Sequence, residues 1–223
     1  MHQKLLIASV TAMLVFLSST SHLLSAEDWT QFRGPGGQGN SAASGLPVEW
    51  GPEKNVAWKV AMPGEGWSSP VVLDDRIYLT AAVPVDGESE DRSLQLLCLD
   101  GDDGEVIWSR GVFRQDGESS PRIHTKNSHA SPTPVIHDGH VYVHFGHQGT
   151  ACVDLDGKVI WKSKAVEYRP VHGNGGSPLV FEDLLIFSTD GAKEQKLNAL
   201  NRHTGELTWQ TKRGIERPKK FAF

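Results

Sequence analysis

The sequence is poor in cysteine, in excess basic charge and in long apolar runs. Its 223 residues include two cysteines, and the formal net charge at pH 7 is −5. Nucleic acids and anionic membrane surfaces bind basic proteins preferentially, so the negative net charge argues against binding to either. The longest apolar stretch, residues 5–17, is too short to cross a bilayer comfortably. No integral membrane segment is expected in the chain that follows it.

That apolar stretch is typical of a targeting signal. Lys4 precedes it as a short basic region, and Leu24-Ser25-Ala26 offers a small residue at a cleavage point. We predict a signal peptide over residues 1–26, with an uncleaved anchor as the weaker alternative. The protein is then exported, either periplasmic or secreted. No cysteine lies near the cleavage point, which argues against a lipid-anchored lipoprotein.

Signatures of common catalytic sites are also missing. The sequence contains no Gly-x-Ser-x-Gly, no His-Glu-x-x-His and no kinase motif set. The glycine-rich residues 33–39 lack the Gly-Lys-[Ser/Thr] ending and the following helix of a phosphate-binding loop. We interpret residues 27–51 as a turn-rich lead-in and predict no catalytic residue. No stretch has a convincing helical period, so the chain is expected to be almost all β.

One hairpin recurs along the chain, each time with a glycine four residues before a tryptophan. Asp156-Gly157, between two alternating runs, is a strong hairpin signal because a primed turn needs positive φ. The tryptophans, including one that ends a partial copy, are spaced by 50, 53 and 48 residues. A period of this size is typical of propeller blades. The repeated residues are Gly104, Gly157 and Gly205, with Trp58, Trp108, Trp161 and Trp209.

A second repeated element precedes each hairpin. It consists of a proline, an apolar pair, an acidic turn and an alternating strand, and it begins at Pro70, Pro134 and Pro178. Proline is tolerated at the first residue of a strand, where the ladder requires no N–H. The two elements together predict blades of four antiparallel strands. The predicted blades are 66–108, 129–161 and 175–209, with irregular insertions at 82–93 and 112–128.

The repeat also suggests roles for the cysteines and tryptophans. Cys98 and Cys152 occupy the same repeat position, which Ala199 fills in the third copy. Equivalent positions in adjacent blades lie beyond the ~7 Å Cα separation that a disulfide allows. We therefore predict two buried free thiols. The tryptophan at the end of each outer strand is predicted to pack across the gap between blades.

The pattern Cys/Ala-x-Asp/Asn, glycine, then tryptophan resembles the tryptophan-docking motif of PQQ-like β-propeller repeats. The sequence from Trp29 onward also resembles exported bacterial PQQ-binding-like or BamB-like proteins. The resemblance implies an all-β partial β-propeller over residues 52–223. It implies about three to four four-stranded antiparallel blades of the PQQ/quinoprotein-dehydrogenase-like type. Rings of this family close with seven or eight blades, on the order of 350–400 residues, so a truncated ring is expected.

The best candidates for ligand binding lie in loops that precede inner strands, which in propellers face the central funnel. Polar groups there, with glycines that allow close approach of the backbone, favour a ligand site. Ordinary turn chemistry is the alternative reading. The candidate residues are Asn127, His129, His172 and Asn174.

Metal sites receive less support from the pattern. His140, Tyr142 and His144 alternate on one strand and share a face, with His147 just beyond. No cysteine or carboxylate completes a recognisable ligand spacing, so ordinary hydrogen bonding of these histidines is favoured. Residues 100–105 superficially resemble a calcium loop, but a solvated hairpin turn is favoured. We predict no metal.

Two functional readings remain. The first is a non-catalytic binding or scaffold module that holds a protein partner or a small ligand at its loops. The alternative is a fragment of a PQQ-dependent quinoprotein alcohol or sugar dehydrogenase, with PQQ and Ca²⁺ as cofactors only in that case. The chain has neither the adjacent cysteine pair of many alcohol-oxidising members nor an assignable catalytic aspartate. A degenerate product with no retained role is a third possibility.

Overall fold

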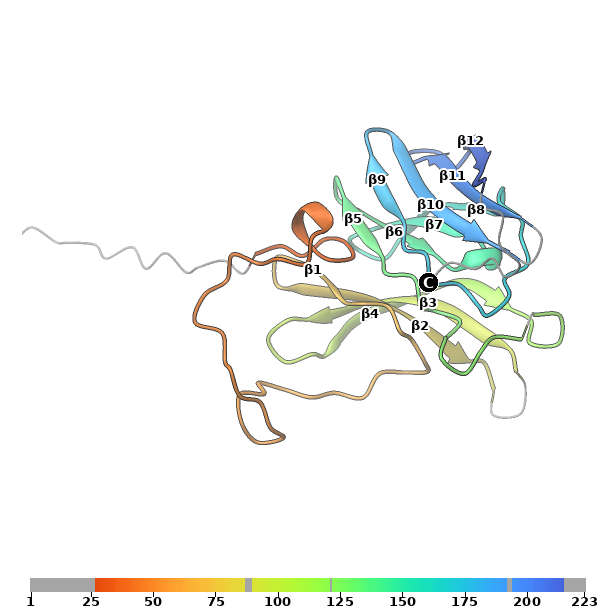
Figure 1. Ribbon diagram of the computed structural model, residues 1–223. Coiled ribbons are helices and arrows are strands. Elements are labelled where there is room, and N and C mark those ends of the chain that lie inside the picture. The colour runs from red at the N-terminus through yellow and green to blue at the C-terminus, as the bar shows by residue number, and fades with distance from the viewer. Residues whose placement is uncertain (1–26, 87–89, 121, 192–193, 215–223) are drawn as a thin grey trace, which may run out of the picture.

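Three four-stranded sheets make up the computed structural model, which describes residues 27–86, 90–120, 122–191 and 194–214 (Figure 1). The predicted signal peptide lies outside the described residues. The first sheet contains β1 (Val71–Leu73), β2 (Arg76–Pro84), β3 (Arg92–Asp100) and β4 (Val106–Gln115). The second contains β5 (Val135–His137), β6 (His140–His144), β7 (Thr150–Asp154) and β8 (Val159–Ser163). The third contains β9 (Leu179–Phe181), β10 (Leu184–Asp190), β11 (Gln195–Asn201) and β12 (Leu207–Lys212).

Within each sheet the strands pair antiparallel and in sequence order, which is the arrangement of a propeller blade. The second blade lies between the first and the third, and the inner strands β1, β5 and β9 neighbour one another. Each inner strand begins directly after the repeated proline. The predicted all-β partial propeller of four-stranded blades is therefore confirmed.

The predicted irregular insertions at 82–93 and 112–128 are wrong in part. β2 extends to Pro84, β3 begins at Arg92 and β4 extends to Gln115. The reason is that apolar alternation continues through these strand ends. Side chains there are buried in the core shared with the second blade, so pairing persists.

The turn at Asp156-Gly157 also differs from the prediction. Only Gly157 has positive φ there, 83°, and four residues separate β7 from β8, so this is not a two-residue primed turn. The Gly157 amide instead donates to the Asp154 carbonyl at 3.1 Å. The primed turn is Asp138-Gly139, between β5 and β6, with φ of 47° and 70°.

Trp108 and Trp161 join neighbouring blades, as predicted for the repeated tryptophans. The Trp108 Nε1–H of the first blade donates to the Leu155 carbonyl of the second at 3.2 Å. The Trp161 Nε1–H of the second blade donates to the Arg202 carbonyl of the third at 2.9 Å. Trp58 repeats the contact on the first blade, donating to the Gly101 carbonyl at 3.0 Å. Each tryptophan therefore bonds the residue that follows the repeated Asp or Asn.

The repeated glycines make room for these rings. A Cβ atom at Gly104 would lie 2.6 Å from the Trp58 ring, at Gly157 3.0 Å from Trp108, and at Gly205 2.5 Å from Trp161. All three glycines also have positive φ, between 75° and 83°, which other residues rarely adopt. The glycine is thus required both by the turn and by the indole that packs on it.

The partial copy that ends in Trp58 does not form a named strand. Residues 55–62 have no strand assignment, although Trp58 docks on the first blade as the other tryptophans dock on theirs. Met62 from the same stretch packs on the outward face of the first blade. This segment therefore covers that face without sheet pairing.

The two cysteines are free and buried, as predicted. Cys98 is opposite Tyr78 and Trp108 across the first blade, and Cys152 is opposite Tyr142 and Trp161 across the second. Burial raises the pKa of both thiols, that of Cys152 to about 12. Both sulfurs therefore act as small apolar groups in the core.

The third blade has one uncovered face. Leu179 and Phe181 are 47% and 59% exposed. Val135, at the equivalent position in the second blade, is 3% exposed because the third blade covers it. Trp209 belongs to this uncovered face because it is opposite Ala199 in the sheet.

The lead-in lies against the inner edges of the first two blades. Trp29 exchanges two backbone hydrogen bonds with Val72 of β1, at 2.8 and 2.9 Å. The Thr30 carbonyl accepts a bond from the Ile136 amide of β5 at 2.8 Å. The 3₁₀ turn η1 (Pro35–Gly37) follows. Part of the predicted turn-rich segment is therefore anchored by the propeller (Figure 1).

Replacing Trp161 by alanine is expected to destabilise the fold by ~3–5 kcal/mol, since it removes a large docked ring and its hydrogen bond. Replacing Trp209 by alanine is the matched control, because no described blade packs on that ring. We expect Trp209→Ala to cost less than half as much in chemical denaturation. Equal losses for the two variants would contradict the docking role.

A second comparison separates ring packing from backbone strain. Gly205 and Gly139 have similar φ, 75° and 70°, but a Cβ at Gly139 would meet nothing within 4 Å. Gly205→Ala is therefore expected to destabilise by about 1–3 kcal/mol more than Gly139→Ala, through displacement of Trp161. Thermal melting of both variants measures the difference, and no difference would mean that the indole does not need the glycine.

Candidate functional site

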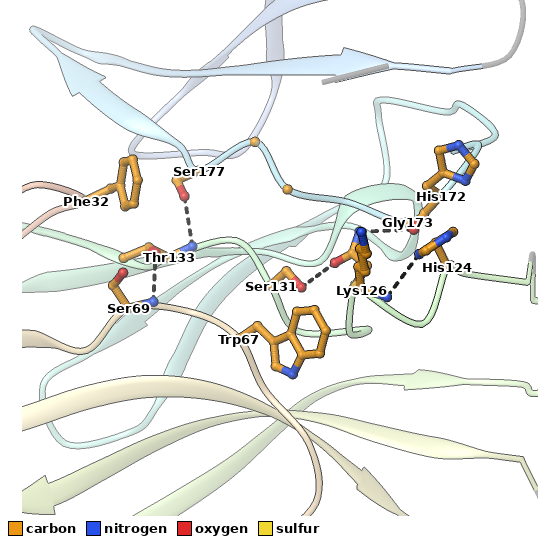
Figure 2. Close-up of a pocket in the computed structure, with 13 residues that line it drawn as sticks. Phe32, Trp67, Ser69, His124, Lys126, Ser131, Thr133, His172, Gly173 and Ser177 are labelled. Atoms are coloured by element: carbon orange, nitrogen blue, oxygen red, sulfur yellow. Dashed lines mark hydrogen bonds between the residues drawn. The ribbon is translucent and has the colours of Figure 1, made fainter. Parts of the chain in front are cut away.

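A pocket of about 670 Å³ lies where the loops before the inner strands of the three blades meet (Figure 2). Those loops end in the repeated prolines, so the blade repeat brings three chain-distant segments to one place. The lead-in adds Phe32 to the wall. The lining residues are Phe32, Trp67, Ser69, His124, Lys126, Asn127, Ser131, Thr133, His172, Gly173, Gly175, Gly176 and Ser177.

Hydroxyl groups link the three loops at one side of the pocket. Ser69, Thr133 and Ser177 each stand immediately before the repeated proline. The Ser69 amide donates to Thr133 Oγ1 at 3.0 Å, and the Thr133 amide donates to Ser177 Oγ at 3.0 Å. Thr133 Oγ1 and Ser177 Oγ thus each accept from a backbone amide of the preceding blade. The series fixes the spacing of the blades around the pocket.

Two aromatic side chains supply the apolar surface. Phe32 is 49% exposed and Trp67 is 54% exposed. The Trp67 backbone is held by its amide, which donates to the Ala130 carbonyl at 3.1 Å. The ring is therefore positioned but remains accessible from the pocket. Exposed aromatic rings on a fixed backbone are common contact groups in binding sites.

The other side of the pocket is polar and positively charged. Lys126 is the one lysine, arginine, aspartate or glutamate among the described residues that line the pocket, so no described carboxylate lines it. His124 Nδ1 accepts a bond from the Lys126 amide at 3.0 Å, so a neutral His124 carries its proton on Nε2. The rings of His124 and His172 meet edge to face, with centroids 5.5 Å apart. Hydrogen-bond donors therefore gather at this side.

Asn127 and His172, two of the predicted ligand-binding residues, line this pocket together. Asn127 Nδ2 donates to the His172 carbonyl at 3.1 Å, which ties the two loops. Gly173 adopts φ of 104°, and a Cβ there would lie 2.5 Å from Asn127 Nδ2. The glycine thus permits the close approach that the sequence suggested.

The other two predicted residues lie elsewhere. Asn174 is 7% exposed, accepts a hydrogen bond from the Tyr168 hydroxyl and packs against Gly146, where a Cβ would overlap it at 1.7 Å. The Asn174 side-chain amide bonds to the Phe145 carbonyl and does not line the pocket. His129 lines a second, more polar pocket of about 470 Å³, together with Gln115 and Arg122.

Next to the second pocket is a group of buried imidazoles. His144, on β6, is 2% exposed, donates or accepts at Thr150 Oγ1 at 2.9 Å, and lies 4.2 Å from the Phe187 ring. His147, in the 3₁₀ turn η2 (Gly146–Gln148), contacts Gln148 Nε2 at 3.0 Å. His144 Nε2 and His147 Nδ1 have no hydrogen-bond partner among the described residues.

His144 shares a face of β6 with His140 and Tyr142, as the alternation indicated. Within the described ranges, no group of three His, Cys, Asp or Glu side chains is arranged to hold a metal ion. In the 100–105 loop, Asp100 Oδ1 accepts from the Asp102 amide at 2.8 Å, as expected of a hairpin turn. Burial lowers the pKa of His129, His144 and His147, that of His144 to about 3.

Acid is therefore expected to destabilise the fold. A neutral buried histidine is favoured by folding, while the unfolded chain takes up protons below its ordinary pKa of about 6.5. The contribution of such a histidine to the free energy of unfolding is fully present above the unfolded-state pKa. It is lost as the pH falls toward the folded-state pKa. His144 alone should account for about 2 kcal/mol between pH 7 and about pH 5. Urea unfolding measured across this pH range should show that the free energy of unfolding changes less with pH in His144→Phe than in the parent protein.

The exposed His137, on β5, provides the control for that experiment. His137→Phe removes an exposed imidazole, which lies 3.3 Å from Asp138 Oδ2, and leaves His144 in place. If His144→Phe and the parent lose stability equally on acidification, the buried imidazole is not the cause.

Sequence reasoning missed most of the pocket lining. The hydroxyl series could have been found, because Ser69, Thr133 and Ser177 precede the proline in all three copies. Phe32 could not, since nothing in the repeat places the lead-in against the inner strands. Lys126 lies one residue from the predicted Asn127, and its importance comes from the absence of lining carboxylates.

The fold and the tryptophan docking define a β-propeller protein built from PQQ-like blades. A family model described as "Outer membrane protein assembly factor BamB" matches residues 95–221, more than half of the chain. The chain therefore belongs to this family. A search of curated proteins gave no significant match.

Solved structures share the fold. Quinohemoprotein alcohol dehydrogenase ADHIIG of Pseudomonas putida HK5 aligns with 71% of this chain at 20% identity and a TM-score of 0.51. The quinohemoprotein alcohol dehydrogenase of Comamonas testosteroni aligns with 70% at 20% identity and 0.50. BamB of Moraxella catarrhalis aligns with 70% at 19% identity and 0.45. The chain spans 22% of the length of each dehydrogenase and 42% of that BamB.

Proposed function

We propose that the chain is an exported binding module that holds a partner at the pocket of Phe32, Trp67 and Lys126, without catalysing a reaction. The observation that carries the proposal is the composition of this pocket. It joins exposed aromatic rings to fixed hydrogen-bond donors, the combination by which pockets orient a ligand. Its lining side chains include no cysteine, aspartate or glutamate. The serines there bond to amides and to Asn127, not to a histidine base.

The placement of the pocket supports binding to a partner rather than a structural role. Its walls come from loops of three blades plus the lead-in, and the blades that carry them are held by docked tryptophans. A site on such a scaffold is rigid before it is occupied, which lowers the entropic cost of binding. Membership of a family described as an assembly factor favours a protein partner. None of the described helices is long or apolar enough to cross a membrane.

The alternative, a fragment of a quinoprotein alcohol dehydrogenase, is favoured by the fold likeness to two such enzymes. Their cofactor chemistry would need acidic ligands for calcium. Among the described residues, no carboxylate lines the pocket and no group of three side chains is arranged to bind a metal ion. The residues present therefore do not fit a calcium-bound quinone, and we derive no redox step from them.

Site-specific photo-crosslinking tests the binding role. A photoreactive phenylalanine derivative placed at Trp67, in cells that produce the full chain, should give a discrete adduct of higher mass. The same derivative at Lys158, an exposed position on the outer turn of the second blade, is the control. Adducts at both positions in equal yield, or none at Trp67, would contradict a binding role for the pocket.

A further inference from the structure

We propose that the pocket binds an extended acidic segment of a polypeptide, which lies along the edge of β9 and presents a carboxylate to Lys126. The proposal rests on the proposed function in one respect, that the pocket is a binding site. It adds the chemistry of the ligand and the way in which the ligand is held. Three independent features of the structure carry it.

The first feature is charge. The chain has a net charge of −5, yet the described residues that line the pocket include a lysine and two histidines and no carboxylate. No ion pair joins Lys126 to any carboxylate of the described residues. The exposed Lys126 ammonium therefore has no carboxylate partner among the described residues and can pair with an anion that enters the pocket. The pocket therefore selects a negatively charged group.

The second feature is the excess of hydrogen-bond donors. His124 presents Nε2–H, because its Nδ1 accepts from the Lys126 amide. Thr133 Oγ1 and Ser177 Oγ each accept from an inter-blade amide, and the half-buried Ser177 keeps its hydroxyl hydrogen for a ligand. An occupant that satisfies these groups must be rich in acceptors. A carboxylate, with two acceptor oxygens, matches this requirement together with the charge.

The third feature shows that the inner edges accept an extended peptide. The protein's own lead-in pairs with β1 through Trp29, and its Thr30 carbonyl accepts a hydrogen bond from the Ile136 amide of β5. Val72, Ile136 and Val180 occupy the same position in the three inner strands. The lead-in bonds the first two, while β9 is the edge of its sheet and pairs with β10 on one side. An exposed edge of this kind recruits an added strand.

The edge of β9 leads directly into the pocket. Gly175, Gly176 and Ser177 line the pocket and are separated from β9 by one proline. Leu179 and Phe181 are exposed next to that edge. In Figure 2, Phe32 and Ser177 lie at one end of the pocket and Lys126 with His124 at the other. A peptide that runs along β9 would therefore enter past Phe32 and reach Lys126, with Trp67 beside its apolar side chains.

Three labelled peptides with blocked ends test the proposal. They share an alternating sequence with phenylalanine and differ only in the intervening residue, which is glutamate, glutamine or lysine. Fluorescence anisotropy with the full mature chain should show the glutamate peptide binding about tenfold more tightly than the glutamine peptide. The lysine peptide should bind least. Equal affinity of the glutamate and glutamine peptides would overturn the acidic specificity.

Substitutions at Lys126 and Val180 test which parts of the protein contact the peptide. Lys126→Glu should weaken binding of the glutamate peptide about tenfold or more, and Lys126→Gln should weaken it less, while the control Lys158→Glu should leave it unchanged. Val180→Pro removes the edge amide that a paired peptide needs, and proline is tolerated on an edge strand. It should weaken binding severalfold, whereas Val180→Ala should not. An unchanged affinity in Lys126→Glu would overturn the assigned carboxylate contact.

The outcomes separate this inference from the proposed function. A crosslink at Trp67 together with equal binding of all three peptides would refute the acidic ligand and keep the binding role. No crosslink and no peptide binding would refute both. If free glutamate displaces the glutamate peptide at the same concentration as the unlabelled peptide does, the ligand is a small acid and the peptide part of the proposal is wrong.

Discussion

The indole that each blade places on the next blade is the interaction on which the rest of the structure depends. A four-stranded sheet of this size cannot bury its apolar faces alone, so the blades are stable only when stacked. Trp108 and Trp161 fasten the outer ends of the stack with a ring on a glycine and an N–H on a backbone carbonyl. The acceptor carbonyl follows an Asp or Asn whose side chain closes the turn. The three parts of the motif therefore act together. The capped turn positions the acceptor carbonyl, and the glycine leaves room for the tryptophan ring that packs on it.

This outer fastening determines the inner geometry. Once the blades are set at fixed angles, the loops that precede their inner strands converge, and Ser69, Thr133 and Ser177 link them by amide–hydroxyl bonds. The pocket forms in the space that these loops enclose, with the lead-in closing one wall. Its character then follows from which side chains the loops carry. Hydroxyls repeat with the blades, whereas Lys126 and Trp67 are particular to one loop each, so scaffold and specificity come from different parts of the sequence.

The repeat explains why the fold could be predicted and the pocket only in part. A glycine four residues before a tryptophan, repeated three times, specifies both the hairpin and its contact with the next blade, so the blades and the free cysteines followed from the sequence. The strand lengths did not follow from the sequence. Apolar alternation continues β2 and β4 into segments that resemble irregular insertions. Asn127 and His172 could be placed near the funnel because their loops immediately precede inner strands. Phe32 was not, because its position depends on backbone pairing between the lead-in and inner strands far away in the sequence.

Hydrogen–deuterium exchange of the indole Nε1–H groups, followed by ¹⁵N–¹H NMR, tests the docking account most directly. Trp108 and Trp161 donate to carbonyls of the next blade, so their exchange requires the blades to separate, while exchange of Trp58 requires its segment to leave the first blade. The account predicts slow exchange for these three protons, at rates that approach those of the buried strand amides, and faster exchange for Trp209. If all four indole protons exchange at the same rate, tryptophan docking does not hold the blades together.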